Sequence, residues 1–171
     1  MNDLKLTGHD GPYDAPISVD GGSVRPDWID YNGHMNVAYY TTAFDIAIDV
    51  LLEDHLGIGE TYVADSGCGP FALQSHYSYA AELVEGEQFY TSLRLLDHDA
   101  KRIHLFCQIH KKAGNELAAS VETLIMNVDH SLRKAAPYPP RVEQRLADML
   151  RSHRSIDHAP QIGAPIGIRR K

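Results

Sequence analysis

The amino-acid sequence predicts an α+β fold in which an antiparallel sheet is wrapped around one long central helix. Apolar side chains recur every three or four positions between residues 36 and 55, and they occupy nearly the whole circumference of the helix that they predict. After residue 70 the period of the pattern falls to two, which is typical of strands. Short polar connections at residues 84–87, 97–100 and 113–115 separate these strands, and connections of that length join antiparallel neighbours.

Before the helix, turn-forming residues divide the chain. Residues 1–16 are rich in such residues and show no period, so we expect a flexible N-terminal arm. Residues 17–25 are expected to form a first strand, interrupted by a turn or bulge at Gly21 and Gly22. Pro26 ends that strand, and a polar segment then leads into the helix.

The predicted helix has an almost entirely apolar surface. Its spacing is set by five large residues, which are Val37, Tyr40, Phe44, Ile48 and Leu51. Asp45, Asp49 and Glu53 recur every four positions and form the only charged stripe. Because so little of the circumference is polar, we expect most of it to be buried inside the curved sheet. Gly57 and Gly59 supply the stop signal.

The second half of the chain predicts four strands and a helix. The alternating segments cover residues 71–79, 88–95, 103–110 and about 116–128. In the last of them the apolar residues change face between Val121 and Leu124, which predicts a bulge near Glu122. After Pro139 and Pro140, an amphipathic helix of about three turns follows, on the surface or against a partner. We therefore assign residues 17–152 to one domain and residues 153–171 to a C-terminal tail.

Composition narrows the function classes. The chain has 171 residues, 43% of them hydrophobic, and no apolar run long enough to cross a membrane, so we expect one soluble, cytoplasmic domain without a membrane partner. Its formal net charge of −7 argues against nucleic-acid binding. Two distant cysteines and ten scattered histidines have no ligand spacing, so no disulfide and no metal site are expected. No nucleophile-elbow, phosphate-loop or zinc-protease motif occurs.

Residues 28–40 carry the most chemistry, because they crowd a carboxylate, an imidazole, two carboxamides and a glycine at the entrance of the helix. A helix N-terminus offers unpaired backbone N–H groups and partial positive charge. A carboxylate placed there can attack, or activate water against, a carbonyl group that the N–H groups polarise. The residue types alone fit a turn with an Asn cap equally well.

The order of residues in this stretch resembles a known signature, Asp30-x-x-Gly33-His34-x-Asn36-x-x-x-Tyr40. It is similar to that of the 4-hydroxybenzoyl-CoA thioesterase-like family of acyl-CoA thioesterases, which have the hotdog fold. Further similarity lies at Tyr79, Glu82-Leu83, Gly86-Glu87 and Asp129. The resemblance implies that the protein hydrolyses a small acyl-CoA to the free acid and CoA without a cofactor. It also implies a homodimer, or a homotetramer built from dimers, with sites between chains.

Within that family, residues 28–35 and 101–106 look closest to thioesterases of carnitine breakdown, some of them fused to carnitine dehydrogenase. Those proteins are thought to act on betainyl-CoA, whose trimethylammonium group would need aromatic faces around it. Five aromatic residues are candidates for such a cage, namely Trp28, Tyr31, Tyr39, Tyr40 and Tyr62. Packing in the core is the alternative role for each of these rings.

The resemblance also implies residue roles. Asp30 is the candidate nucleophile or general base. Backbone N–H groups around Gly33, His34 and Met35 would polarise the thioester carbonyl, and glycine would let the substrate approach the backbone closely. The His34 side chain would orient Asp30 or bind the carbonyl, or serve only the turn. Asn36 is expected to cap the helix. Apart from the resemblance, Lys101 and Arg102 form one of several basic pairs that could meet phosphates such as those of CoA, and the alternative is that such pairs are solvated strand ends or turn residues.

Three other functions stay open. The letters Asp30-x-Asn32-x-His34-x-Asn36 are also similar to plant-type acyl-ACP thioesterases, in which case Asn32 would position the substrate carbonyl. A hydratase or dehydratase of acyl thioesters shares helix and sheet, but it uses a His with a distant carboxylate. A non-catalytic acyl-CoA-binding protein would lack the carboxylate of the motif. The presence of Asp30 before Gly33 and His34 favours hydrolysis.

Overall fold

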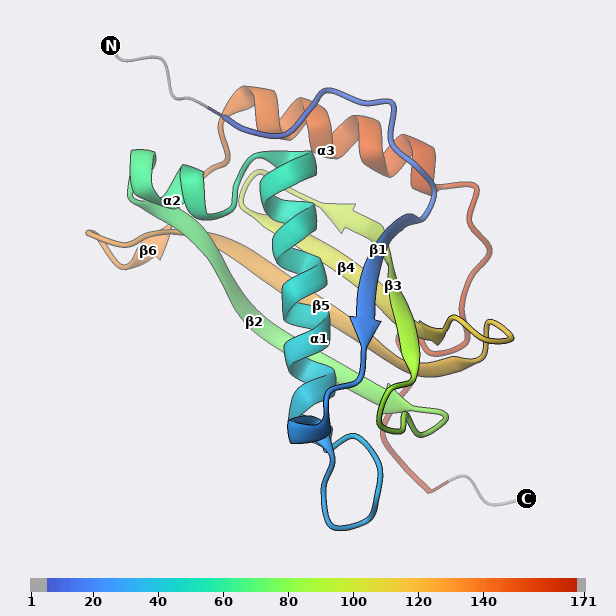
Figure 1. Cartoon of the computed structure of the whole chain (residues 1–171). Helices are drawn as coiled ribbons and strands as arrows, with labels where there is room; N and C mark the ends of the chain where they lie inside the picture. The colour runs from blue at the N-terminus through green and yellow to red at the C-terminus, as the bar shows by residue number, and fades with distance from the viewer. Residues whose placement is uncertain (1–5, 169–171) are drawn as a thin grey trace.

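A computed structural model describes residues 6–168 (Figure 1). The elements follow in the order β1 (Ile17–Ser23), a 3-10 turn η1 (Pro26–Trp28), α1 (Val37–Val50), a π-helical turn η2 (Leu51–Leu56), α2 (Glu60–Ser66), β2 (Cys68–Tyr79), β3 (Gln88–His98), β4 (Arg102–Lys111), β5 (Leu117–Asp129), β6 (Lys134–Ala135) and α3 (Pro140–His153). The strands expected from the period of two are all present. The short elements α2 and β6 have no counterpart in the sequence prediction.

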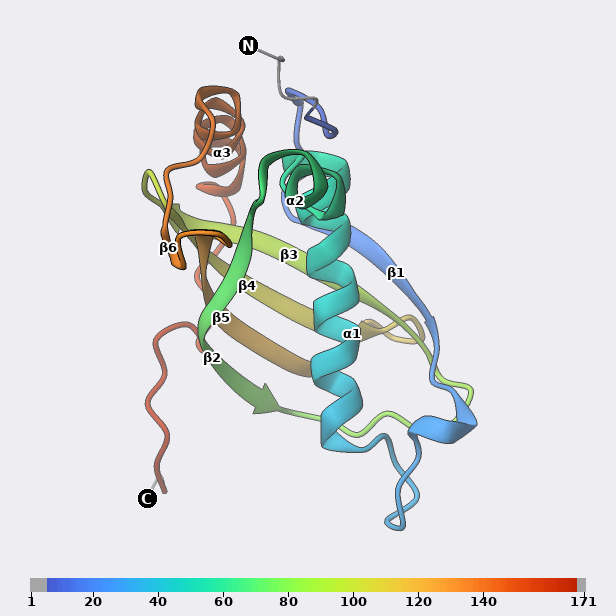
Figure 2. The same cartoon turned by 90° about the vertical axis from the view of Figure 1, so that its left-hand side faces the viewer.

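The sheet has the strand order β1-β3-β4-β5-β2, with β6 beside β5, and its pairings are antiparallel. It curls around one side of α1, which confirms the α+β prediction of a sheet wrapped around a helix (Figure 2). The predicted irregularity in the first strand is also confirmed, because the register of β1 against β3 shifts between Asp20 and Gly22. A Cβ at Gly21 would lie 2.1 Å from the Phe89 ring, so the backbone there needs glycine.

The central helix differs from the expectation in two respects. The helical run ends at Leu56, just before Gly57 at φ +73°, but its last six residues are π-helical and only Val37–Val50 is α-helical. The expected burial of nearly the whole circumference is wrong for this chain alone. Val37 is 58% exposed and Ile46 is 53% exposed, because the sheet covers only the side that carries Tyr40, Ala43, Phe44 and Ala47.

The predicted bulge near Glu122 is also wrong. The alternation of β5 is regular from Val121 to Asn127, and its register shift against β4 lies earlier, at Ala118. Thr123 takes an inward position at which the sequence pattern predicts an apolar residue. Its hydroxyl lies 2.9 Å from Ser75 Oγ and donates to the Gln74 carbonyl at 3.0 Å, so burial leaves it with partners. Leu124 therefore points to the outer face, and the register shift lies on β2 between Ala72 and Gln74.

The C-terminal helix α3 packs against β3 and η2 and buries Val142, Leu146 and Met149, which are part of the predicted apolar stripe. Residues 6–16 run between α3 and the end of η2 (Figure 1). Arg145 fixes them: its side chain donates to Asp10 and to the carbonyl groups of Thr7 and Leu56. In residues 6–168 no helix is long and apolar enough to cross a membrane.

Candidate active site

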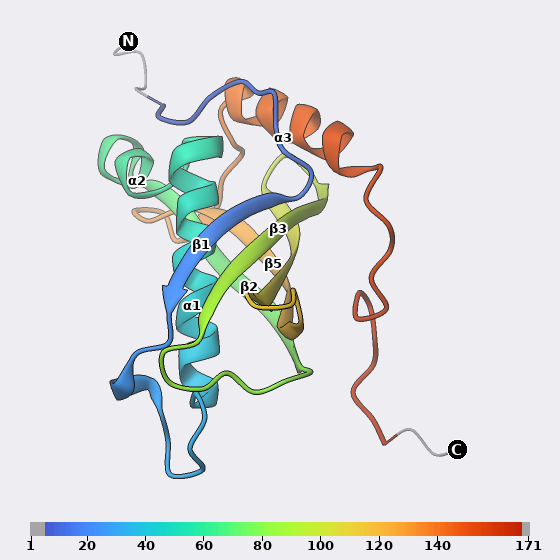
Figure 3. The ribbon, with the colours of Figure 1, turned by 45° about the vertical axis from the view of Figure 1, so that its right-hand side comes forward.

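The segment between η1 and α1 forms a tight loop that projects from the body of the molecule (Figure 3). The Asp30 N–H donates to the His34 carbonyl at 3.0 Å, and the Gly33 N–H donates to the Asp30 carbonyl at the same distance. Gly33 has φ +83°, a left-handed conformation that favours glycine. Tyr31 lies on this loop and is 96% exposed. The loop is therefore ordered by its own hydrogen bonds rather than by burial.

The Asp30 carboxylate is held at the entrance of α1. Its Oδ1 accepts the Asn32 N–H at 2.8 Å, and its Oδ2 lies 3.5 Å from the Asn36 amide nitrogen. The Asn36 Oδ1 accepts the Ala38 N–H at 3.0 Å, which confirms that Asn36 caps the helix. Asn36 thus contacts both the Asp30 carboxylate and the start of α1. Asp30 itself is half-buried, so water still reaches it.

The backbone N–H groups of this loop differ in their availability. Those of Gly33 and Met35 are occupied, because Gly33 bonds to Asp30 and Met35 donates to the Leu83 carbonyl at 2.7 Å. In the part of the chain that the structure describes, the N–H groups of His34 and Val37 have no acceptor. These two donors, rather than the Gly33 and Met35 groups of the sequence prediction, are free to polarise a carbonyl.

A groove of about 360 Å³ opens beside these donors. It runs between the start of α1 and the chain that follows β2, and its lining residues are His34, Met35, Val37, Tyr40, Tyr79, Ala80, Ala81 and Glu82. Asp30 lies on the neighbouring loop and is not among them. A larger hollow of about 600 Å³ lies on the outer face of the sheet under the C-terminal tail, and none of its lining residues belongs to the 28–40 stretch.

Two tyrosines form the aromatic part of the groove. Tyr40 is buried, and its hydroxyl accepts the Leu83 N–H at 3.0 Å. Burial raises the pKa of Tyr40, so its hydroxyl stays neutral at physiological pH. The Tyr79 ring, 50% exposed, lies 5.4 Å from that of Tyr40 at an angle of 77°. The resemblance included Tyr79 and Glu82, but the sequence prediction gave neither a place in the site. The alternation over residues 71–79 could have indicated that Tyr79 faces the helix.

The other aromatic residues of the predicted cage lie elsewhere. Trp28 stacks on Tyr39 at 5.5 Å between ring centres, and the Arg25 guanidinium lies 4.9 Å from the Trp28 ring centre. Tyr31 is in solvent. Tyr62 is buried at the other end of the helical run, where its hydroxyl accepts a hydrogen bond from Asn127 at 3.2 Å. Of the five candidates, only Tyr40 lines the groove.

The basic pair Lys101 and Arg102 lies at the opposite end of the sheet. Arg102 pairs with Met126 in the ladder, whereas Tyr79 pairs with Ala119. Seven residues of β5 separate these positions, or about 24 Å at about 3.4 Å per residue. Arg102 also binds Asp99 at 2.5 Å, which holds the Asp99 pKa at about 2. Within one chain this pair and the groove are not brought together.

Among residues 6–168, no three or more His, Cys, Asp or Glu side chains are arranged to hold a metal ion. Both cysteines are free, and burial raises the pKa of the Cys107 thiol well above its usual range. The groups that the structure places at or beside the groove are the Asp30 carboxylate, backbone donors, His34 and two tyrosines.

Comparison with known proteins supports the thioesterase resemblance found in the sequence. The model of the thioesterase-like superfamily matches residues 24–146. The chain is 30% identical over 145 residues to a betainyl-CoA thioesterase of Pseudomonas aeruginosa, covering 85% of this chain and 91% of that protein. It is 32% identical over 156 residues to an L-carnitine dehydrogenase/betainyl-CoA thioesterase of Rhizobium meliloti, covering 91% of this chain but only 31% of that longer protein.

A solved structure extends the comparison to the fold. A hypothetical protein of Staphylococcus aureus, solved in complex with CoA, superposes with a TM-score of 0.83 at 24% identity, covering 93% of this chain and 99% of that one. At this identity the likeness concerns the fold, which is the hotdog arrangement of curled antiparallel sheet and helix. The family assignment rests on the match over residues 24–146 and on the Pseudomonas relative. The chain belongs to the thioesterase-like superfamily.

Proposed function

We propose that the protein is an acyl-CoA thioesterase that hydrolyses a small acyl-CoA to the free acid and CoA, with betainyl-CoA as its substrate. The observation that carries this proposal is the pair of unoccupied N–H donors at His34 and Val37, which open on a groove beside the Asp30 loop. The choice of the betainyl group follows from the two relatives, both of which are named as betainyl-CoA thioesterases. We take residues 17–152 as the thioesterase domain.

In the proposed reaction the two N–H groups bind the thioester carbonyl oxygen and stabilise the negative charge that develops on it. Asp30 removes a proton from water as the water oxygen attacks the carbonyl carbon. The C–S bond then breaks, and the CoA thiolate takes up the proton. Direct attack by Asp30 would instead form a mixed anhydride that water hydrolyses afterwards. Both routes need the same carboxylate and the same donors.

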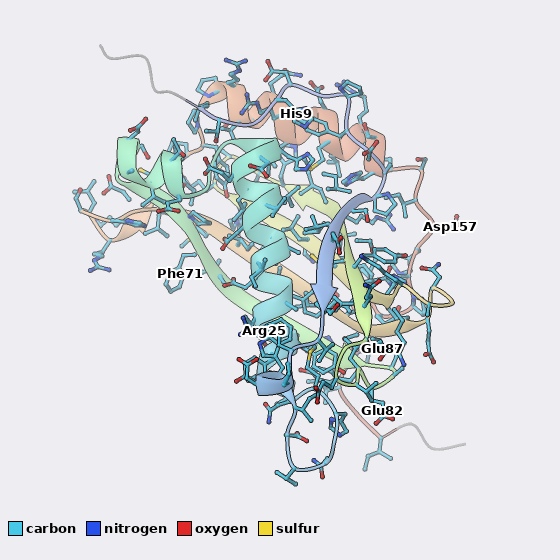
Figure 4. The ribbon with its side chains drawn as sticks, viewed as in Figure 1. His9, Arg25, Phe71, Glu82, Glu87 and Asp157 are labelled. Carbon is cyan, nitrogen blue, oxygen red and sulfur yellow. The ribbon has the colours of Figure 1, made fainter. Side chains whose placement is uncertain are left out.

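We also propose that the working form is a homodimer, or a homotetramer built from dimers. Three features support a second chain beside this one. The Asp30 loop projects from the body; β2 forms an unpaired edge of the sheet; and Phe71 on β2 is 61% exposed, pointing away from α1 (Figure 4). A neighbouring chain would bring a second loop to the groove and could bring Lys101 and Arg102 to the CoA phosphates. Light scattering after size exclusion tests this, and a monomer at the assay concentration would contradict it.

A cytoplasmic location completes the proposal, because both cysteines are free and disulfide-free proteins are typical of reducing compartments. The activity itself is tested by release of free thiol from betainyl-, acetyl- and butyryl-CoA. We expect kcat/KM for betainyl-CoA to exceed the other two by about tenfold or more. Equal values would remove betainyl-CoA as the preferred substrate but leave thioester hydrolysis in place.

A further inference from the structure

We propose that Glu82, together with Tyr79 and Tyr40, forms a subsite that selects acyl groups with a permanent positive charge. This inference rests on the proposed thioesterase function and specifies how the groove recognises its substrate. None of the sequence signals for an aromatic cage included Glu82 or Tyr79. Their place in the site follows from the lining of the groove.

The charge of the groove is the first argument. Among the described residues, Glu82 is the only acidic side chain that lines it, and no Lys or Arg does. In the described part of the chain the Glu82 carboxylate has no hydrogen-bond or ion-pair partner, so its charge is uncompensated. The nearby Lys111 is already engaged, at 3.2 Å from both Glu87 and Glu116. A cationic ligand would therefore be attracted to this groove and a carboxylate-bearing acyl group repelled.

The aromatic pair is the second argument. Tyr40 is fixed by its hydrogen bond to the Leu83 N–H, and the Tyr79 ring stands at 77° to it. Two rings at a steep angle form a corner, and Tyr79 is half exposed there. A quaternary ammonium group cannot donate hydrogen bonds, so ring faces and a carboxylate are the contacts that recognise it. Among the other lining residues, Val37, Ala80 and Ala81 have small apolar side chains, which leave room for methyl groups.

The order of charges along the groove gives a third reason. The unoccupied N–H groups of His34 and Val37 make the α1 side positive, whereas Glu82 makes the opposite side negative. A betainyl thioester has the matching order, with a carbonyl oxygen at one end and, one methylene away, a trimethylammonium group. Placing the carbonyl against the N–H donors directs the cation toward Tyr79 and Glu82. A neutral acyl group of the same shape would satisfy only the first of these contacts.

The test compares two thioesters of the same shape, betainyl-CoA and 3,3-dimethylbutyryl-CoA. They differ only in the atom that carries the three methyl groups, which is a charged nitrogen in the first and a neutral carbon in the second. Wild type is expected to prefer betainyl-CoA in kcat/KM by about tenfold or more. Glu82→Gln should lower kcat/KM for betainyl-CoA by about tenfold and change that for the neutral ester by less than about twofold. Tyr79→Leu should act in the same sense, and Tyr79→Phe should restore the preference because it keeps the ring.

A matched control is available in the turn after β2. Glu85 is an exposed carboxylate that does not line the groove, so Glu85→Gln changes the net charge equally and should leave both esters unaffected. Circular dichroism and thermal unfolding of each variant exclude a folding defect, and Glu82 is exposed enough for its replacement to be tolerated.

In the activity assay, two results overturn the subsite. An unchanged preference in Glu82→Gln removes Glu82 from recognition. An equal loss for both esters makes Glu82 part of the catalytic or structural machinery instead. If wild type hydrolyses neither ester, the proposed function fails, and the subsite is then judged by calorimetric binding of the two intact esters. Tighter binding of betainyl-CoA that is lost in Glu82→Gln supports the subsite, and equal affinities overturn it.

Discussion

Tyr40→Phe removes a single oxygen atom from the junction between the site loop and the sheet. In the native protein the Tyr40 hydroxyl accepts the Leu83 N–H at 3.0 Å, and the Leu83 carbonyl accepts the Met35 N–H at 2.7 Å. Leu83 is fully buried, so water cannot replace the lost acceptor. A buried N–H group left without a partner costs about 1–3 kcal/mol. We therefore expect the free energy of unfolding to fall by about 2 kcal/mol.

The matched control is Tyr79→Phe, which removes the same atom from the neighbouring ring. The Tyr79 hydroxyl has no hydrogen-bond partner among the described residues, and half of the side chain is exposed, so the expected change is within about 0.5 kcal/mol. Urea unfolding of the three proteins, analysed by linear extrapolation, measures both values. If the two variants differ from one another by less than about 0.5 kcal/mol, the Tyr40–Leu83 bond does not hold this junction.

Two further predictions concern the end of the fold where residues 6–16 meet α3. Arg145→Ala removes a buried guanidinium with three hydrogen bonds and should lower the free energy of unfolding by about 3 kcal/mol. Arg141→Ala, whose exposed side chain binds the same Asp10, should lower it by less than about 1 kcal/mol. Comparable losses in urea unfolding would contradict the role of burial. His153 is buried, accepts the Leu95 N–H at its Nδ1 and donates from its Nε2, so only the neutral ring fits and burial lowers its pKa below the usual value near 6.5. The unfolded chain therefore takes up this proton first, and stability should be full above about pH 6.5 and decline as the pH falls toward the folded-state pKa; a His153→Gln variant with the same pH slope as wild type would refute this.

The extent to which the sequence predicts this fold depends on how local each signal is. The spacing of Tyr40, Phe44 and Leu51 identifies the central helical run because one face of it is buried along its whole length. The pattern does not show that the opposite side stays open, because apolar residues such as Ile46 look the same whether a neighbour covers them or not. Thr123 shows the opposite limit of the apolar pattern, because here a buried position is occupied by a polar residue. A buried threonine with two hydrogen-bond partners breaks the apolar alternation without breaking the strand.

The candidate site likewise has a local part, which the sequence predicts, and a long-range part, which it does not. The loop from Asp30 to Asn36 is closed by contacts among near neighbours, so its residues could be identified from their order alone. Glu82 reaches the groove from a segment more than forty positions away, and no local period indicates such a meeting. The availability of backbone donors is equally invisible in the sequence, because the Met35 N–H is taken by Leu83.

Catalysis by the Asp30 carboxylate is best tested by thiol release from betainyl-CoA by wild type and by Asp30→Asn, with folding of the variant checked by urea unfolding. The substitution keeps the size of the side chain and its hydrogen bond from Asn32, but it removes the basic, nucleophilic oxygen. We expect kcat to fall by about 10² or more while the free energy of unfolding changes by less than about 1 kcal/mol. Undiminished turnover in a folded Asp30→Asn protein would show that the chemistry takes place without this carboxylate.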